Sequence, residues 1–285
     1  MYEASQNMPS PGATVATTLM MVLGALACSS FDGGSDVLAQ PALDPMTAQM
    51  SLAGANWSCL GPARATSPPV TSGRGRVVYS MQVVDITTRL TPSGVRARAC
   101  NLLDVECSQP LGDWVPADEQ GWVDLTLSKG FVGFLEFMIP GFVPGTFYPG
   151  EPVEESTTLN YPVLPITPDA LVTLAGALDI AIDPQLGFLA VRSFDCAGVP
   201  ATDVVFSKEG PGDRWYLSDG LPSVTATSTG SEGYGGYVNV PLGLTSIDVM
   251  TPTGRSISGS RSLVVRPAWF SSMFVLPPGI QIAPP

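Results

Sequence analysis

The chain has 285 residues, a formal net charge of −12 at pH 7, no histidine, and a hydrophobic content of 45%. The lack of imidazole excludes Ser-His and Cys-His catalysis and histidine metal sites, and the acidic balance argues against nucleic acid as a partner. The apolar content is enough for packed cores despite 28 prolines and 30 glycines, so a disordered chain is excluded as well.

The first element along the chain is an apolar run that starts at Leu19 and ends in small residues before Cys28. It is too short to span a bilayer and is typical of a cleavable export segment. The tripeptide Leu26-Ala27-Cys28 resembles the lipobox of bacterial lipoproteins. This resemblance implies that residues 1–28 are a signal peptide, that Cys28 carries the lipid, and that residues 29–53 form a flexible tether.

Ser29, directly after that cysteine, resembles the sorting signal of outer-membrane lipoproteins. The resemblance implies an exported protein whose lipid anchors it to the outer membrane, on the periplasmic or the extracellular face. Residues 1–27 contain no Lys or Arg, although an export signal normally starts with basic residues, and a start at Met8 or Met20 would account for this. The competing interpretation is a buried apolar helix whose cysteine follows small residues by chance.

Four cysteines remain once Cys28 is assigned to lipid, and an even number is typical of disulfides in an oxidising compartment. Three pairings of Cys59, Cys100, Cys107 and Cys196 are possible. We favour Cys100 with Cys107, because a strand end and the following loop can bring them together, which leaves Cys59 and Cys196 to link the two halves of the chain. A zinc site needs closely spaced Cys or His pairs, which the sequence lacks.

Alternating apolar and polar side chains predict strands in the first half of the chain. From Val77 onward Tyr79 and Met81 form the inner face of a half-buried strand. After a turn at Thr91-Pro92-Ser93-Gly94, Val95–Ala99 alternates strictly and predicts the clearest strand of the chain, with its two arginines on a solvated face.

The next elements complete the first half. A turn at Asp118–Gly121 leads into an alternating strand at Trp122–Leu127. Phe131–Ile139 is strongly apolar, but a glutamate inside it and the prolines after it exclude a spanning helix and favour a core strand that leaves the sandwich edge. The Pro-rich segment Val143–Pro165 is predicted to wrap or link, with its glutamates in a solvated loop rather than a calcium site.

A helix opens the second half at Thr167-Pro168-Asp169, because this tripeptide supplies an N-cap hydroxyl, a proline at the first helical position and an acid in the first turn. The helix is expected to end near Leu178. Short strands are predicted after it. They are Phe188–Phe194, Val204–Phe206, Trp215–Tyr216, Val224–Thr227, Tyr237–Val240, Ile247–Met250, Ser262–Val265 and Trp269–Leu276.

The two halves echo each other at a spacing of about 110 residues, which indicates an internal duplication. The segment from Asp85 to Val95 corresponds to that from Asp195 to Val205, and Asp118–Leu125 corresponds to Ser231–Val240. These segments resemble the carboxypeptidase-regulatory-like, or transthyretin-like, β-sandwich repeat over most of 75–138 and 187–252. In that family the repeat is mostly a non-catalytic companion or spacer, so the resemblance implies no active site.

The resulting fold prediction is all-β, with two tandem transthyretin-like or Ig-like antiparallel β-sandwich domains. The first domain is expected at residues 54–165 and the second, with the short helix, at residues 166–285. The Pro-rich linker and the helix join them.

The leading functional hypothesis is a non-enzymatic, membrane-anchored surface or periplasmic lipoprotein that acts as a structural or binding module, with a protein or a glycan as partner. No nucleophile elbow, P-loop or dinucleotide-binding spacing is present, so we predict no catalytic residue, cofactor or metal.

The alternative is carbohydrate binding through exposed aromatic side chains near turns of the second domain. The candidates are Trp215, Tyr216, Tyr234 and Tyr237. A third hypothesis is a hydrolase that uses Glu154 with Glu155, or Asp113 with Asp118, and nothing in the sequence places either pair across a cleft.

Overall fold

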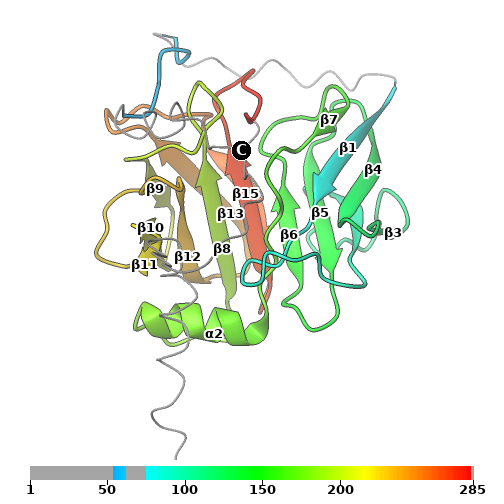
Figure 1. Cartoon of the computed structure of the whole chain (residues 1–285), viewed down its shortest axis with the longest axis horizontal. Coiled ribbons are helices and arrows are strands. Elements are labelled where there is room, and N and C mark those ends of the chain that lie inside the picture. The colour runs from blue at the N-terminus through cyan, green and yellow to red at the C-terminus, as the bar shows by residue number, and fades with distance from the viewer. Residues whose placement is uncertain (1–53, 62–74, 284–285) are drawn as a thin grey trace, which may run out of the picture. The chain divides into compact units, whose positions relative to one another are not determined.

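Nearly all regular structure in the chain is β-strand, as the sequence predicts (Figure 1). The computed structural model describes residues 54–61 and 75–283, which contain 15 strands and one helix. The strands of the first half are β1 (Arg76–Gln82), β2 (Arg96–Asn101), β3 (Val115–Pro116), β4 (Trp122–Ser128), β5 (Gly133–Met138), β6 (Gly145–Tyr148) and β7 (Thr157–Thr158).

The second half starts with the helix and continues with eight strands. In chain order they are α2 (Pro168–Ala177), β8 (Gly187–Ser193), β9 (Val205–Lys208), β10 (Asp213–Ser218), β11 (Leu221–Ser223), β12 (Tyr234–Val240), β13 (Gly243–Met250), β14 (Arg261–Val265) and β15 (Phe270–Val275).

The alternation in the sequence predicts the inward faces of β1 and β4 correctly. Tyr79 and Met81 are buried on β1, and their partners Leu125 and Val123 are buried on β4 in an antiparallel ladder. On the opposite face of β4, Asp124, Thr126 and Ser128 are exposed. A strand with this period of two buries one face and solvates the other, which is the pattern of a two-layer sandwich.

The strands form three sheets, whose orders are β4-β1-β7, β11-β10-β12-β8-β15-β6-β5-β2-β3 and β14-β13-β9. Most neighbours are antiparallel, as predicted. Three pairs are parallel, because β15 runs parallel to both β6 and β8, and β7 runs parallel to β1. Parallel neighbours are joined by long connections, which the local pattern of a sequence does not reveal.

The long sheet crosses the boundary that the sequence predicts between residues 165 and 166. Strand β15 lies between β6 of the first half and β8 of the second half, and it is hydrogen-bonded to both (Figure 1). The two halves therefore share one hydrogen-bonded sheet. The predicted domain limits stay a prediction.

The two small sheets cover opposite faces of the long sheet. On β5, Leu135 packs in one core with β1 and β4, whereas its neighbour Phe134 packs in a second core with β9, β13 and β14. Strand β15 does the same, with Phe274 in the first core and Met273 in the second. Successive side chains of a strand point to opposite faces, so the first half is covered on one side and the second half on the other.

The helix α2 closes a third, smaller core. It starts where the sequence predicts, and the Thr167 hydroxyl accepts a hydrogen bond from the Ala170 N–H at 3.2 Å. Leu171 packs against Phe188 and Trp215 on the face of the long sheet opposite to the β14-β13-β9 sheet. The helix therefore covers the part of that face that the β4-β1-β7 sheet leaves open.

One turn in each half has the same hydrogen-bonded form. Asp85 follows β1 and accepts a hydrogen bond from the Thr87 N–H at 2.7 Å, and Asp195 follows β8 and accepts one from the Ala197 N–H at 2.8 Å. Both aspartates are buried. The same Asx turn at corresponding positions is consistent with the predicted duplication.

The structure differs from the sequence predictions at several strands, among them the short strands β3, β7 and β11, which were not predicted. The predicted edge strand β5 lies inside the long sheet, between β2 and β6. Strand β6 was expected to be part of a wrapping segment, because prolines flank its four residues. The predicted strand Val224–Thr227 is absent, since that segment is irregular and β10 pairs instead with β11 and β12.

Candidate functional site

A buried ion network lies at the boundary between the two halves. Glu136 of β5 is 1% exposed, and its Oε2 accepts a hydrogen bond from Arg98 Nε of β2 at 2.6 Å. Its Oε1 pairs with Nη1 of Arg266, which follows β14 in the second half and is 4% exposed. Two guanidinium groups therefore share one carboxylate, and the network joins three segments that are far apart in sequence.

Aromatic rings flank this network on both sides. The guanidinium of Arg98 lies 4.5 Å from the ring centre of Trp114, and that of Arg266 lies 4.5 Å from the ring centre of Trp269. Arg96 stacks on Trp114 as well, at 5.1 Å. Such contacts stabilise a partly desolvated cation by about 0.5–2 kcal/mol each, so the rings compensate for part of the burial of the arginines.

The arginines of β2 correct a prediction. We expected both Arg96 and Arg98 on a solvated face, and only Arg96 is exposed. The side chain of Arg98 is 22% exposed and pairs with the buried Glu136. The loop that carries Trp114 covers this end of the face, which the alternation of the strand alone does not reveal.

The disulfide Cys100–Cys107 lies beside the network and closes a short loop at the end of β2. The bond joins the pair that the sequence favours, with Cα atoms 5.4 Å apart. Inside the loop, the carbonyl of Val105 accepts a hydrogen bond from Arg266 Nε at 2.6 Å. The loop therefore supplies a hydrogen-bond acceptor for Arg266, which belongs to the other half of the chain.

The same place holds the one cluster of metal-ligand residue types found among the described residues, namely Cys100, Cys107 and Glu136. The two sulfur atoms are bonded to each other and both oxygens of Glu136 are taken by guanidinium groups. The cluster has no thiolate or carboxylate oxygen left for an ion. Its groups instead bind the segments of the network to one another.

Asp104 holds the turn of the disulfide loop. Its carboxylate accepts hydrogen bonds from the N–H groups of Gln109 at 2.8 Å and Ser108 at 3.0 Å. These hydrogen bonds, that from Gln109 first, lower the pKa of the Asp104 carboxyl below its ordinary value. The carboxylate form is therefore preferred in the folded loop.

We expect the loop to lose protection at acid pH. A carboxyl with a lowered pKa in the folded state contributes stability that is fully present above its unfolded pKa of about 4 and is lost as the pH falls through the folded pKa. The protection factors of the Ser108 and Gln109 amides should fall below about pH 4, as measured by hydrogen exchange. In an Asp104→Asn variant this pH dependence should be absent, and its persistence would contradict the assignment.

The second predicted disulfide is also present. Cys59 and Cys196 are bonded across a sequence separation of 137, and their Cα atoms lie 5.6 Å apart. Next to the bond, Asp195 Oδ2 accepts a hydrogen bond from the Asn56 N–H at 2.8 Å. The segment before the first strand is thereby fixed to the second half of the chain.

The four aromatic residues predicted to bind a sugar are all buried, so that prediction is wrong. Their exposed fractions are 3% for Trp215, 0% for Tyr216, 9% for Tyr234 and 6% for Tyr237. Trp215 and Tyr234 pack together in the core under α2, with ring centres 5.7 Å apart. A ring without an open face cannot stack on a sugar, and the carbohydrate-binding hypothesis loses its basis.

Tyr216 and Tyr237 instead bind the edge strand of the covering sheet. The Phe206 N–H of β9 donates to the Tyr216 hydroxyl, and the Tyr237 hydroxyl donates to the Phe206 carbonyl, both at 2.9 Å. Burial raises the pKa of Tyr237 to about 12 and also raises that of Tyr216. These hydroxyls replace the ladder partner that an edge strand lacks.

Strand β14, at the opposite edge of the β14-β13-β9 sheet, is also bound by a tyrosine hydroxyl. The hydroxyl of Tyr148 on β6 donates to the carbonyl of Val264 on β14 at 3.0 Å and accepts from its N–H at 2.8 Å. Tyr148 belongs to the first half and Val264 to the second. The sheet β14-β13-β9 is thus bound at both edges by tyrosines of the long sheet.

Removal of the Tyr148 hydroxyl should destabilise the protein measurably. In a Tyr148→Phe variant the buried Val264 N–H has no partner, which costs about 1–3 kcal/mol of unfolding free energy. Urea denaturation would measure the loss. Tyr161→Phe is the matched control, because the Tyr161 hydroxyl makes no hydrogen bond to the described residues. Equal effects of the two variants would show that the bond to Val264 is not what matters.

Two hollows in the described structure are each about 10 Å³, which is about the space of one water molecule. Arg192 and Tyr234 line one of them. Arg192 Nε is buried without a hydrogen-bond partner there, and burial lowers the pKa of this guanidinium. Neither hollow has room for a substrate.

Sequence reasoning missed Glu136, Arg266, Trp114 and Trp269. One signal was available, since Glu136 is the single charged residue inside the apolar run Phe131–Ile139. A glutamate in a core strand is almost never fully buried without a paired cation. The identity of the partner depends on β15 and the disulfide loop, which bring distant segments together.

Cys28 and the predicted signal peptide and tether lie outside the described residues. Within the described part of the chain, no helix has the length and hydropathy needed to cross a bilayer.

The sequence matches no protein-family model, and no curated protein is similar to it. Among solved structures, the chain is similar to the Bacillus anthracis TIE protein, with 14% identity and a TM-score of 0.23 over 70% of this chain and 34% of that one. It is similar to a streptococcal ancillary pilin, with 11% identity and a TM-score of 0.22 over 72% and 63% of the two chains.

A third similar structure is GBS52, the minor pilin of Streptococcus agalactiae, with 10% identity and a TM-score of 0.23 over 73% and 99% of the two chains. The match spans about a third of the TIE protein and less than two thirds of the ancillary pilin. Likenesses at these scores carry no argument about what the chain does, so its function rests on its own residues.

Proposed function

We propose that the chain is an exported, non-catalytic structural module, attached to the outer membrane through a lipid on Cys28. The observation that carries the proposal is the Cys59–Cys196 disulfide, which joins the segment that follows the predicted tether to the second half of the fold. Disulfides of this kind are typical of proteins outside the cytoplasm. A pulling force applied through the tether would reach the second half through the disulfide at Cys59 and the first half through the chain that follows Cys59.

The buried network supports the same role. Arg266 of the second half is bound by Glu136 and by the Val105 carbonyl of the first half. Strand β15 adds backbone hydrogen bonds to strands of both halves. A module that resists separation of its halves is suited to hold a surface apart from its anchor, as expected for transthyretin-like repeats that act as spacers.

Fractionation of the native protein tests export and attachment. We expect it in the membrane fraction with a lipid-modified Cys28 at its N-terminus, as read by mass spectrometry, and with both disulfides formed under non-reducing conditions. A Cys28→Ala variant should leave the membrane fraction, whereas a Cys59→Ala variant, which keeps the lipid site, should stay there. An unacylated, fully reduced protein in the cytosol would contradict the proposal.

Force spectroscopy tests the structural role. When the chain is pulled from both sides of the described region, the intact Cys59–Cys196 bond should hide the residues between the two cysteines from extension. Reduction should add the contour of 137 residues, about 450–490 Å at 3.3–3.6 Å per residue. Equal contour lengths before and after reduction would show that this bond does not carry the load.

A further inference from the structure

The long sheet and the β14-β13-β9 sheet have protected edges. The long sheet ends at β3 and β11, and each of these short strands contains a proline, Pro116 and Pro222. Proline has no N–H to offer and short strands pair weakly, so both ends are poor templates for another strand. Each edge strand of the β14-β13-β9 sheet is bound by tyrosine hydroxyls at one residue, Phe206 on β9 and Val264 on β14.

Strand β4 is the exception. It forms one edge of the β4-β1-β7 sheet, it has seven residues, and it contains neither proline nor glycine (Figure 1). At the two ends of its ladder with β1, the Lys129 N–H donates to the Gly75 carbonyl and the Val83 N–H donates to the Gly121 carbonyl. Antiparallel hydrogen bonds alternate, so Val123, Leu125 and Leu127 are bonded to β1.

The backbone groups of the other residues of β4 point away from β1. The backbone groups of Trp122 are both bonded to Asp118. The Trp122 N–H donates to the Asp118 carboxylate, and the Asp118 N–H donates to the Trp122 carbonyl. The N–H and C=O groups of Asp124 and Thr126 have no hydrogen bond to the described residues. The side chains of these two residues and of Ser128 are exposed. Among the described residues, β4 therefore presents an open strand edge of about five residues.

From this geometry we infer that β4 pairs with β4 of a second copy of this chain, in an antiparallel, two-fold arrangement. A two-fold axis at Thr126 places Thr126 opposite its own copy and Asp124 opposite Ser128 of the second copy. A centre two residues earlier would place Asp124 opposite itself, and like charges directly opposite each other are destabilising. The charges of β4 thus select the register.

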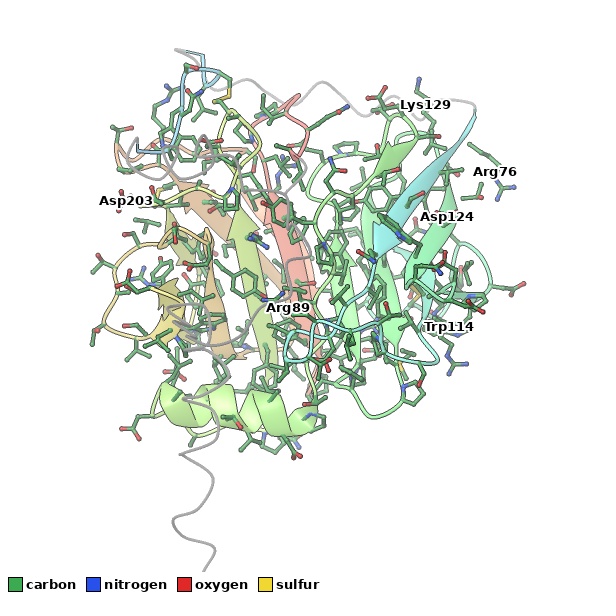
Figure 2. All side chains as sticks on the ribbon, in the orientation of Figure 1. Arg76, Arg89, Trp114, Asp124, Lys129 and Asp203 are labelled. Carbon is green, nitrogen blue, oxygen red and sulfur yellow. A yellow bond between two sulfur atoms is a disulfide. The ribbon has the colours of Figure 1, made fainter. Side chains whose placement is uncertain are left out.

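Charge complementarity supports this register. Within one chain Ser128 pairs with Arg76 of β1, and both face outward. Across the proposed interface Asp124 lies opposite Ser128 of the second copy, and Arg76 of that copy is the next residue in the same row. Asp124 and that Arg76 are then two strand spacings apart, about 10 Å, a gap that their side chains bridge along the sheet face. Both residues lie on the outer part of the β1–β4 pair (Figure 2).

The rest of the interface fits a strand pair as well. Leu125 and Leu127 face the core on the inner side, and in the pair each lies opposite the other from the second copy. On the outer side, Val78 of β1, which is 40% exposed, stands beside the central threonines. Threonine pairs and β-branched neighbours are favourable across strands. A pairing of five residues buries little area, so we expect a weak, concentration-dependent dimer.

Charge reversal tests the pairing through sedimentation equilibrium of the full chain. Asp124→Arg places two arginines against each other across the interface, and Arg76→Asp does the same with two aspartates, so each variant alone should self-associate about tenfold more weakly or worse. A mixture of the two variants restores both opposite-charge pairs and should form the mixed dimer. Glu209→Arg, which makes the same change of net charge as Asp124→Arg at an exposed residue of the second half, should behave as the unchanged protein.

A backbone variant tests the strand pairing itself. Thr126→Pro removes an N–H that β1 does not use, so the fold should stay intact by circular dichroism while dimerisation is lost. A protein that is monomeric up to about 1 mM overturns the inference, because that corresponds to an association of only about −4 kcal/mol. So does a dimer that is indifferent to Thr126→Pro, or a pair of charge variants that fails to form the mixed dimer.

Discussion

Replacement of Glu136 by glutamine is expected to lower the free energy of unfolding by about 3–5 kcal/mol. The amide cannot balance two guanidinium groups, and Arg266, at 4% exposure, would keep a buried charge without a counter-ion. Nη2 of Arg266 already has no hydrogen-bond partner among the described residues. A loss of this size is a large share of the 5–15 kcal/mol that typically separates folded from unfolded domains.

Urea denaturation measures the effect, with Glu154→Gln as the control at an exposed glutamate. The Arg98 pair alone should matter less, because its side chain is 22% exposed and water shares its charge. Replacement of the whole network by apolar residues of similar size should recover much of the lost stability, since no unpaired charge then remains. A loss below about 1 kcal/mol in Glu136→Gln would show that water reaches the site.

Removal of the Cys59–Cys196 disulfide should be the second large perturbation. In the chain-entropy description, a closed loop of 137 residues contributes about 5 kcal/mol and one of 7 residues about 2 kcal/mol. The Cys59→Ala/Cys196→Ala variant should therefore lose more stability than Cys100→Ala/Cys107→Ala. Comparison of their unfolding curves in urea without reductant tests the order.

The local disulfide gives a distinct signature. Its loss should free the loop that binds Arg266 through the Val105 carbonyl, so amide protection should fall around Asp104 while β12 and β13 keep theirs. The long-range disulfide should act on the whole unfolding transition instead, because it limits the unfolded chain. A larger loss of global stability in the Cys100→Ala/Cys107→Ala variant would contradict the loop-length argument.

Local pattern predicted most of the fold. The alternation of β1, β2 and β4 placed their buried faces correctly, and the capping signals at Thr167 placed the start of α2. Each of these features depends on residues that are neighbours in sequence. The disulfide pairs followed from the same reasoning, because one pair is close in the chain and the other two cysteines are then left for each other.

Long-range pairing set the limit of prediction. Strand β6 has four residues between prolines, and it is a strand because β5 and β15 bind it on both sides. Tyr216 and Tyr237 lie near turns in the sequence, which favoured exposure, but their rings cross the core to reach the backbone of Phe206. A tyrosine near a turn gives the same local signal whether its ring is buried or exposed.

The place of β15 has a consequence for how the protein is made. Phe274 of this strand belongs to one core and Met273 to the other, so neither core is complete until residues 270–275 have been delivered. A chain that leaves a ribosome or a narrow export channel one residue at a time keeps both halves unfinished through most of its passage. Such a chain stays unfolded enough to pass through the channel. Strand β15, which emerges late, then completes both cores together.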